Sequence, residues 1–439
     1  MKKALYSLLT LFGFLLFAFL PAQAQNQAPL ALVLTADGPI TPALQEYLER
    51  GLEIAEQRQA EVLILQLNTP GGSVDLMSKM VQVIRSSQVP VVVYVSPRGA
   101  IAGSAGTVIT LAGHLAIMAP ETAIGAASPV GSQGEDIGET MEAKTKEIIK
   151  ATIRSIAAGR SPEAILLAED TVDNAKAASA NEALEVGLVD FIATDLEDLL
   201  TKIDGLTVET TSGMRTLHTA KAQIDHLPLS FVEQLLQILT NPNIIFLLLT
   251  IGVQAVLIEI SHPGGWAPGF IGAVCLALAI YGLGILPVNW FGLVFLAISF
   301  VLFILDIKAP THGALTAAGI GSFILGALVL FNSPGTPEFW RVSVPLVVVT
   351  SLFTAAIFAT ILTFALRAQK APLRTGGESL VGRAGFARSD ILPHKGGMVQ
   401  VAGELWSAEL SEGEESIPKG MRVEVVSVLG VRVKVKRAS

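Results

Sequence analysis

The 439-residue sequence contains one cysteine, Cys275, and it lies within an apolar run. A lone apolar cysteine excludes a disulfide framework, a zinc site built on cysteines and a cysteine nucleophile. No basic stripe with interleaved aromatic residues is present and the formal net charge is −8, which argues against nucleic acid as the ligand. The few histidines are scattered and there is no Walker loop, so neither a metal nor a nucleotide cofactor is expected.

Charged residues are almost missing between residues 243 and 367, where apolar runs are nearly continuous. Five candidate membrane spans lie near residues 244–260, 267–286, 291–307, 314–331 and 344–366. Several are at the short end of the roughly 20 residues that cross a bilayer, so one or two could be tilted, re-entrant or differently bounded. Buried core helices are the alternative, but five such runs in series favour a membrane domain over residues 226–370. Just before them, residues 231–239 form a short amphipathic segment that could lie along a bilayer surface.

The N-terminus has the three regions of a secretory signal: two lysines, an apolar run over residues 5–20, and Pro21-Ala22-Gln23-Ala24. We predict a signal peptide over residues 1–24, with an uncleaved anchor helix as the alternative. On either interpretation the following segment is exported.

Basic residues in the connections predict the membrane orientation. Lys308 follows the third run, and Arg367, Lys370 and Arg374 follow the fifth, while Arg341 alone follows the fourth. By the positive-inside rule the first four face the cytoplasm. With five spans, the N-terminal domain is then extracytoplasmic and the C-terminal domain cytoplasmic.

The soluble part that precedes the membrane block alternates strand and helix patterns. Strands are expected at residues 30–34, 62–67, 91–95 and 114–118, and helices near 41–59, 74–87, 142–158 and 162–168. This order implies βαβ crossovers and a parallel sheet with helices on both faces. We predict an α/β domain over residues 25–225, with a capped helix, a glycine stop and a return strand at 178–190 and a polar stretch at its end.

Residues 371–439 return to short alternating strands with glycine turns. Five such strands predict a small all-β barrel of the OB type. Single-stranded nucleic acid would need stacking aromatics in a basic groove. Only Phe386 and Trp406 are aromatic here, so core packing or protein contact is the better interpretation.

Two small-residue turns, each directly after an apolar strand pattern, could carry chemistry. They are Thr69-Pro70-Gly71-Gly72-Ser73 and Ala102-Gly103-Ser104-Ala105-Gly106. In each, the strand pattern breaks at glycine and passes into a helix-like segment, so backbone N–H groups and a helix dipole point at one spot. The pair predicts an oxyanion cradle and a serine nucleophile, provided that some base can take the serine proton.

The base is harder to identify from the residues. His114 lies in a buried strand pattern and is more naturally a satisfied core histidine, while His218 and His226 fall in the polar stretch. A lysine remains, and Lys144, Lys146 and Lys150 share one predicted helix. Lys144 and Lys146 are two residues apart and point to different sides, so only one can face the site. Any of the three, taken alone, is more often solvated.

Together these residues carry a family resemblance. The exported domain resembles the Clp-protease/crotonase superfamily, and the whole chain is similar to long-form NfeD proteins, membrane-bound serine proteases often encoded beside a stomatin-like protein. The most specific matches are Thr69-Pro70-Gly71-Gly72, Gly103-Ser104-Ala105-Gly106-Thr107, Met118-Ala119-Pro120, Ile124-Gly125-Ala126, Glu182-Ala183-Leu184, Gly187-Leu188-Val189 and Gly403-Glu404-Leu405-Trp406-Ser407-Ala408.

The resemblance implies a serine endopeptidase with a Ser-Lys dyad. Its serine falls on Ser104 and its base on Lys144, although a two-residue slip in the alignment would select Lys146. The oxyanion donors fall on the backbone N–H groups of Gly72 and Ala105. The implied substrate is an apolar peptide, such as the hydrophobic end of a stomatin-like partner, and the implied assembly is a homo-oligomer, at least a dimer. Asn68 stands where the family pattern has an aspartate, which should affect only loop packing.

Two other functions stay open. One is a non-catalytic membrane scaffold that binds a stomatin-like protein. The other is crotonase-type acyl-CoA chemistry, which fits poorly because the exported compartment supplies little CoA and the site lacks paired acids. A buried Lys144 close to Ser104 would favour the protease, whereas a solvated Lys144 directed away would favour the scaffold.

Overall fold

The computed structural model describes residues 28–131, 138–261, 265–309, 311, 313–334, 336–370 and 377–438. The predicted signal peptide lies outside the described residues. The chain divides into two compact units, Met1–Val301 with Ala318–Phe353, and Leu302–Ala317 with Thr354–Ser439. The first unit contains the α/β domain and the second contains the C-terminal barrel.

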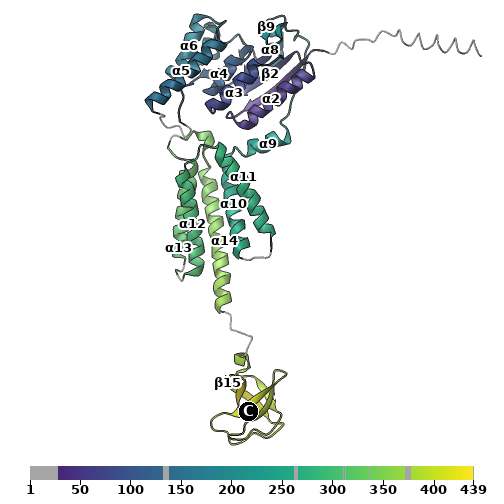
Figure 1. Ribbon diagram of the computed structural model, residues 1–439, viewed down its shortest axis with the longest axis vertical. Helices are drawn as coiled ribbons and strands as arrows, with labels where there is room; N and C mark the ends of the chain where they lie inside the picture. Colours follow the sequence, from purple (N-terminus) through teal and green to yellow (C-terminus); the bar gives the residue numbers. More distant parts are fainter. Residues whose placement is uncertain are drawn as a thin grey trace, which may run out of the picture. The chain divides into compact units, whose positions relative to one another are not determined.

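A six-stranded parallel sheet forms the centre of the α/β domain (Figure 1). Its order is β11-β1-β2-β3-β5-β8. The strands are β1 (Leu30–Asp37), β2 (Val62–Asn68), β3 (Val91–Val95), β5 (Leu115–Met118), β8 (Phe191–Ile192) and β11 (Gln223–His226). The central strands are buried on both faces, which is why they read as continuous apolar runs. The predicted parallel α/β architecture is confirmed.

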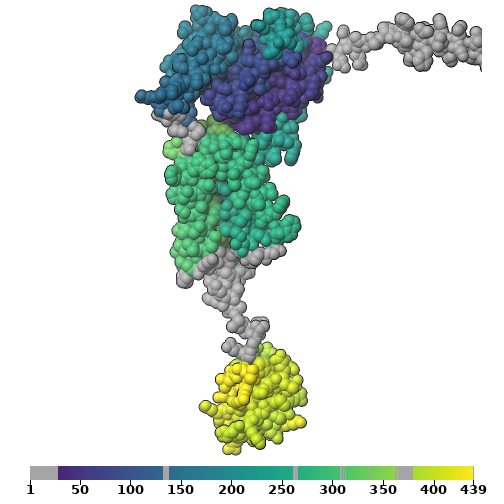
Figure 2. Space-filling view, in the orientation of Figure 1, coloured from purple at the N-terminus to yellow at the C-terminus, as the bar shows by residue number. Residues whose placement is uncertain are grey.

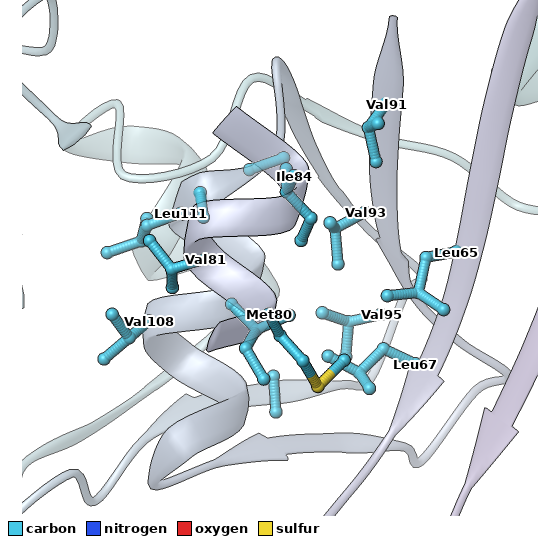
Figure 3. Close-up of a cluster of buried hydrophobic side chains, with 14 of the residues drawn as sticks. Leu65, Leu67, Met80, Val81, Ile84, Val91, Val93, Val95, Val108 and Leu111 are labelled. Atoms are coloured by element: carbon cyan, nitrogen blue, oxygen red, sulfur yellow. The ribbon is translucent and has the colours of Figure 1, made fainter. Parts of the chain in front are cut away.

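Helices cover both faces of this sheet. They are α2 (Pro42–Gln57), α3 (Val74–Arg85), α4 (Ala105–Ala112), α7 (Ala180–Glu185) and α8 (Leu196–Ile203). Two further helices, α5 (Glu139–Ile156) and α6 (Pro162–Asp173), pack against each other beside the sheet, and α5 also contacts α4 (Figure 1). Alternate side chains of β2 enter opposite cores: Leu65 packs with α3 and α4, while Ile64 packs with Leu199 of α8. Figure 3 shows the first of these cores, with Met80 and Ile84 of α3 facing Leu65 and Val93.

A second, three-stranded sheet was not predicted from the sequence. It contains β4 (Ile101–Gly103), β6 (Ala123–Gly125) and β7 (Ala177–Ser179) in the order β4-β6-β7. Each strand has only three residues, too few for an alternating pattern to be visible. This sheet holds the segment that leads into Ser104.

The helix α7 has the predicted caps. Ser179 and Glu182 form a capping box, and Gly187 follows the helix with φ +77°. The return strand, β8, begins at residue 191 rather than within the predicted segment. It is an edge strand and pairs with β5 through only two residues.

The polar stretch before the membrane block, for which no strands were predicted, is folded. It forms a hairpin of β9 (Thr207–Thr210) and β10 (Gly213–Thr216), and then β11, which pairs in parallel with β1. His226 is opposite Val33 in that pairing. The expected domain limit at residue 225 therefore falls inside a strand. The segment ends in α9 (Phe231–Ile238), the predicted short amphipathic helix.

The membrane block contains the helices α10 (Pro242–Ser261), α11 (Ala267–Ile285), α12 (Trp290–Lys308), α13 (Ala314–Phe331) and α14 (Val344–Lys370). By length and composition, the described residues contain four candidate spans rather than the predicted five. They are Pro242–Ile260, Ala267–Ile285, Ala314–Phe331 and Glu338–Thr360. The apolar stretch of α12, Trp290–Asp306, is shorter. Close contacts at glycines join neighbouring helices: a Cβ on Gly272 would lie 2.9 Å from Gly252 O.

The C-terminal unit ends in a closed barrel with the order β12-β13-β14-β16-β15. Its strands are β12 (Ala384–Ala387), β13 (Gly397–Val401), β14 (Glu404–Leu410), β15 (Arg422–Leu429) and β16 (Arg432–Arg437). Val399, Val423 and Val433 are fully buried inside it. The barrel is the rounded yellow body in Figure 2. The predicted small OB-like barrel is confirmed.

Candidate active site

The two glycine turns lie against each other. The Thr69 N–H donates to Ile101 O at 2.7 Å, and the Gly103 N–H donates to Thr69 O at 2.9 Å. A Cβ on Gly71 would lie 2.6 Å from Ser104 Cβ, and a Cβ on Gly106 would lie 2.5 Å from Thr69 Cγ2. Both distances are too short for a side chain, so this approach of the two turns needs glycine at both positions.

Ser104 stands where β4 ends and α4 begins. Its φ is +52° and its ψ is −119°, a conformation that costs a residue with a side chain about 1–3 kcal/mol. The neighbouring structure imposes it: the Ser104 N–H donates to Gly125 O at 2.8 Å. The fully buried Thr107 lies one turn further on, and its hydroxyl oxygen accepts the Gly125 N–H at 3.0 Å. The half-buried Ser104 hydroxyl forms no cap bond to α4.

Two backbone donors near Ser104 are available to a ligand. Within the described residues, neither the Gly72 N–H nor the Ala105 N–H forms a hydrogen bond. The N–H of the neighbouring Gly71, by contrast, donates a hydrogen bond to Thr69 Oγ1 at 3.0 Å. Ala105 is also the first residue of α4, where the positive end of the helix dipole attracts a developing negative charge. The fold therefore leaves unpaired the two donors that the resemblance selects.

Asn68 holds the same region through its amide. Its Nδ2 donates to Asp37 Oδ1 at 2.8 Å, and its Oδ1 accepts the Ile101 N–H at 3.0 Å. An aspartate at this position would place a second carboxylate against Asp37. The amide avoids that repulsion, and its contacts lie in the loop whose packing the departure from the family pattern was expected to affect.

The three lysines of α5 differ in their partners. Lys146 Nζ lies 2.7 Å from Glu142 Oε1 and donates to Asp173 O at 3.1 Å. Lys150 lies 2.6 Å from Glu147 and 3.1 Å from Asp173, and these hydrogen bonds raise its pKa. Lys144 is exposed and forms no hydrogen bond or ion pair within the part of the chain that the structure describes, to Ser104 or to any other group.

The face of α5 that carries Lys144 also carries exposed apolar side chains. Met141 and Ile148, three residues before and four after it, are 58% and 66% exposed. The first buried residue of the helix is Ile149. The N-terminal half of α5 therefore offers an apolar strip with a lysine in its middle.

His114 is a core histidine, as the sequence favoured. Its Nδ1 accepts the Val91 N–H at 3.0 Å, and burial, with a smaller effect of Arg85, lowers its pKa to about 4. It stays neutral at physiological pH and accepts a hydrogen bond at the start of the interior strand β3. Among the residues that the structure describes, no three His, Cys, Asp or Glu side chains gather into a possible metal site.

The architecture and this site define a Clp/crotonase-like α/β domain with a strained serine beside unpaired backbone donors, joined to membrane helices and an OB-like barrel. Family comparisons cover the same three parts. Residues 32–211 match the NfeD1b N-terminal domain, residues 243–364 the NfeD integral membrane domain, and residues 377–437 the NfeD-like C-terminal, partner-binding domain. The chain belongs to the NfeD family and is a multi-pass membrane protein.

Two relatives match over nearly their full lengths. The chain is 34% identical to the membrane-bound protease PH1510 of Pyrococcus horikoshii over 446 residues, which cover 100% of this chain and 98% of that protein. It is 28% identical to the membrane protein NfeD1b of Bacillus subtilis, with 97% of each covered. Among solved structures, it is similar to the 1510-N membrane protease specific for a stomatin homolog from Pyrococcus horikoshii. The two are 32% identical, the match covers 49% of this chain and 100% of that chain, and the TM-score is 0.42.

Proposed function

We propose that this protein is a membrane-bound serine endopeptidase that uses a Ser104/Lys144 dyad. The observation that carries the proposal is the geometry at Ser104, whose strained backbone lies against the turn at Gly71, with the unpaired N–H groups of Gly72 and Ala105 nearby. Full-length similarity to a membrane-bound protease supports the same activity.

In this mechanism, Ser104 Oγ attacks the carbonyl carbon of the peptide and its proton passes to Lys144 Nζ. The oxyanion accepts hydrogen bonds from the Gly72 and Ala105 N–H groups, and each such donor typically contributes ~3 kcal/mol in the transition state. The Lys144 ammonium then protonates the leaving amine, which leaves an acyl-enzyme on Ser104. Water attacks this ester, its proton returns through Lys144, and the carboxylic acid product departs as Ser104 is restored.

Of the three lysines, Lys144 suits the role of base best. Lys146 and Lys150 are both held by carboxylates, and at Lys150 the hydrogen bonds to Glu147 and Asp173 raise the pKa and favour the ammonium form. Lys144 has no such partner among the described residues. It is exposed, however, and a lysine becomes a base only when water is excluded from it.

An apolar substrate would supply that exclusion. A peptide lying on Met141 and Ile148 would cover Lys144 between them and lower the polarity around its amine. This supports an apolar peptide as the substrate class. A hydrophobic segment of a stomatin-like protein is the source that we propose, because the similar 1510-N protease is described as specific for a stomatin homolog.

One observation favours a different function. Lys144 is exposed and does not contact Ser104, as a non-catalytic scaffold would allow. In that case the α/β domain would bind apolar peptides of a stomatin-like protein without cutting them. The strained Ser104 and the unpaired donors would then serve no purpose, which is why we favour the protease.

We also propose that the α/β domain is extracytoplasmic, that the barrel is cytoplasmic, and that the protein assembles into a homo-oligomer. Opposite placement of the two domains requires an odd number of crossings, so α12 must span the bilayer as well. Its 19 residues extend about 28 Å, close to the ~30 Å of the hydrocarbon layer. Protease accessibility of the barrel in sealed right-side-out vesicles tests the orientation, and crosslinking in the membrane tests the assembly.

The decisive experiment for the proposed activity compares four forms of the full-length protein on an apolar peptide near neutral pH. They are the native form, Ser104→Ala, Lys144→Ala, and Lys146→Ala as the matched control. We expect Ser104→Ala and Lys144→Ala to lose about 10³-fold or more in kcat/KM, and Lys146→Ala to stay within a few-fold. Cleavage by all forms alike would rule out the dyad, and loss only with Lys146→Ala would move the base. Binding without cleavage by any form would support the scaffold.

A further inference from the structure

The helix α9 presents its apolar side chains outward. Phe231, Val232 and Ile238 are 80%, 57% and 50% exposed, and Leu235 is exposed between them. The charged residue of this helix, Glu233, is only 3% exposed. Helical spacing puts Phe231, Leu235 and Ile238 on one stripe and Glu233 on the opposite side. A helix on a water-facing surface has the reverse arrangement.

Polar contacts to the buried carboxylate of Glu233 and to the segment before α9 fix this orientation. Arg50 of α2 binds Glu233 with two nitrogens, Nε to Oε1 and Nη2 to Oε2, both at 2.7 Å. Arg50 Nη2 also donates to Pro228 O at 2.7 Å, and the Tyr47 hydroxyl donates to Leu227 O. If α9 rotated to hide its apolar stripe, the ion pair between Arg50 and Glu233 would break, and breaking a buried ion pair is strongly destabilising. The stripe must therefore be covered by something outside the α/β domain.

The chain itself places this stripe near lipid. Helix α10, the first candidate membrane span, begins at Pro242, four residues after Ile238. Four residues of extended chain reach at most about 14 Å. Of the three intervening residues, Leu239 and Thr240 are buried, which shortens the reach further. The helix is therefore held within a short distance of the level at which α10 enters the bilayer.

We propose that α9 lies in the interface of the lipid bilayer, with Phe231, Val232, Leu235 and Ile238 among the upper acyl chains, and that the Arg50–Glu233 pair tethers the α/β domain to this surface. This role is independent of whether Ser104 is catalytic. No lysine or arginine occurs in α9, so apolar burial alone drives its contact with lipid. The contact should not depend on anionic headgroups.

Fluorescence of the full-length protein in phosphatidylcholine vesicles tests this placement. With Cys275→Ser as the background, single cysteines at Ile238→Cys or Leu235→Cys carry an environment-sensitive dye, and Gln237→Cys is the matched control on the flank nearer Glu233. We expect nitroxide groups on the upper acyl chains to quench positions 238 and 235 at least about twofold more than position 237. Replacing half of the lipid with phosphatidylglycerol should leave this difference unchanged.

Three results would overturn the proposal. Quenching of position 238 by aqueous iodide, at the level seen for position 237, would show that the stripe faces water. A blue-shifted dye that lipid nitroxides do not quench would show that protein covers the stripe, from a second copy or a partner. Quenching that appears only with phosphatidylglycerol would mean that charge, not apolar burial, holds the helix. A thermal melt of each labelled variant, matched to the background protein, keeps loss of folding from being mistaken for any of these.

Discussion

The two sides of the candidate site are built very differently. On the serine side, Gly71 and Gly106 bring two turns into contact closer than any side chain would allow, and hydrogen bonds to Gly125 fix the backbone of Ser104. On the lysine side, the first half of α5 is exposed, and Lys144 has no partner within the described residues. In the mechanism that we propose, the fold would thus preorganise Ser104 and the two N–H donors, and Lys144 would become a base only when a peptide covers α5.

This division has a physical logic. Strain at Ser104 and unpaired N–H groups can be held permanently, because surrounding backbone contacts compensate for them. A neutral lysine cannot be held in the same way without a dry surrounding. If the apolar strip excludes water only while a substrate is bound, Lys144 would become a base only in the complex with substrate.

The largest expected effect on the free energy of unfolding comes from His114, which directly precedes β5 of the six-stranded sheet on the serine side. His114 has a pKa of about 4 in the folded chain and of 6.5 in a model peptide. Its contribution to stability is therefore complete above pH 6.5 and is lost as the pH falls from 6.5 towards 4, by up to about 3 kcal/mol. Urea unfolding of the full chain in detergent should show this slope, and His114→Gln should flatten it. Equal slopes for the two proteins would show that His114 is not held neutral.

Gly106→Ala should damage the serine side next most strongly. The added methyl group would lie 2.5 Å from Thr69 Cγ2, and such overpacking typically costs about 2 kcal/mol. Gly159→Ala, just beyond the end of α5, is the matched control because no atom lies within 4 Å of its Cβ position. Its effect should stay within about 0.5 kcal/mol. Similar melting shifts for both variants would contradict the tight contact between the turns.

Asn68→Asp should cost less, about 1 kcal/mol at pH 7, because it sets two carboxylates against each other at a partly exposed site. The loss should disappear below pH 4 as the pair takes up a proton. Adding Asp37→Asn to Asn68→Asp should restore the native stability at pH 7. A double-mutant cycle with no coupling would show that this contact does not position the loop before Ser104.

The smallest effect on stability is expected on the lysine side. Met141→Ala and Ile148→Ala should each change the free energy of unfolding by less than about 0.5 kcal/mol, since both side chains are exposed. If the substrate covers this strip, KM for an apolar peptide should rise several-fold. Leu166→Ala on α6, another exposed apolar residue, should leave KM unchanged. Unchanged KM in all three variants would remove the strip from the substrate site.

Much of the fold could be predicted from local pattern. The apolar runs of β1, β2 and β3 with helices between them predict a parallel sheet, and five short strands with glycine turns predict the barrel. The short strands β4, β6 and β7 could not be recognised, because three residues carry no period. The strand β11 in the polar stretch could not be recognised either, because it is polar and lies at the sheet edge.

The sequence by itself determined which residues are candidates for chemistry: two glycine turns after apolar strands, Ser104 in the second of them, and a helix with three lysines. Only the tertiary structure decided how they are used. It brought Thr69 against Gly106, left the Gly72 and Ala105 N–H groups unpaired, and gave carboxylate partners to Lys146 and Lys150 but not to Lys144. The reason is that pattern along a chain reports burial and local conformation, whereas hydrogen bonds and ion pairs depend on segments that meet only after folding.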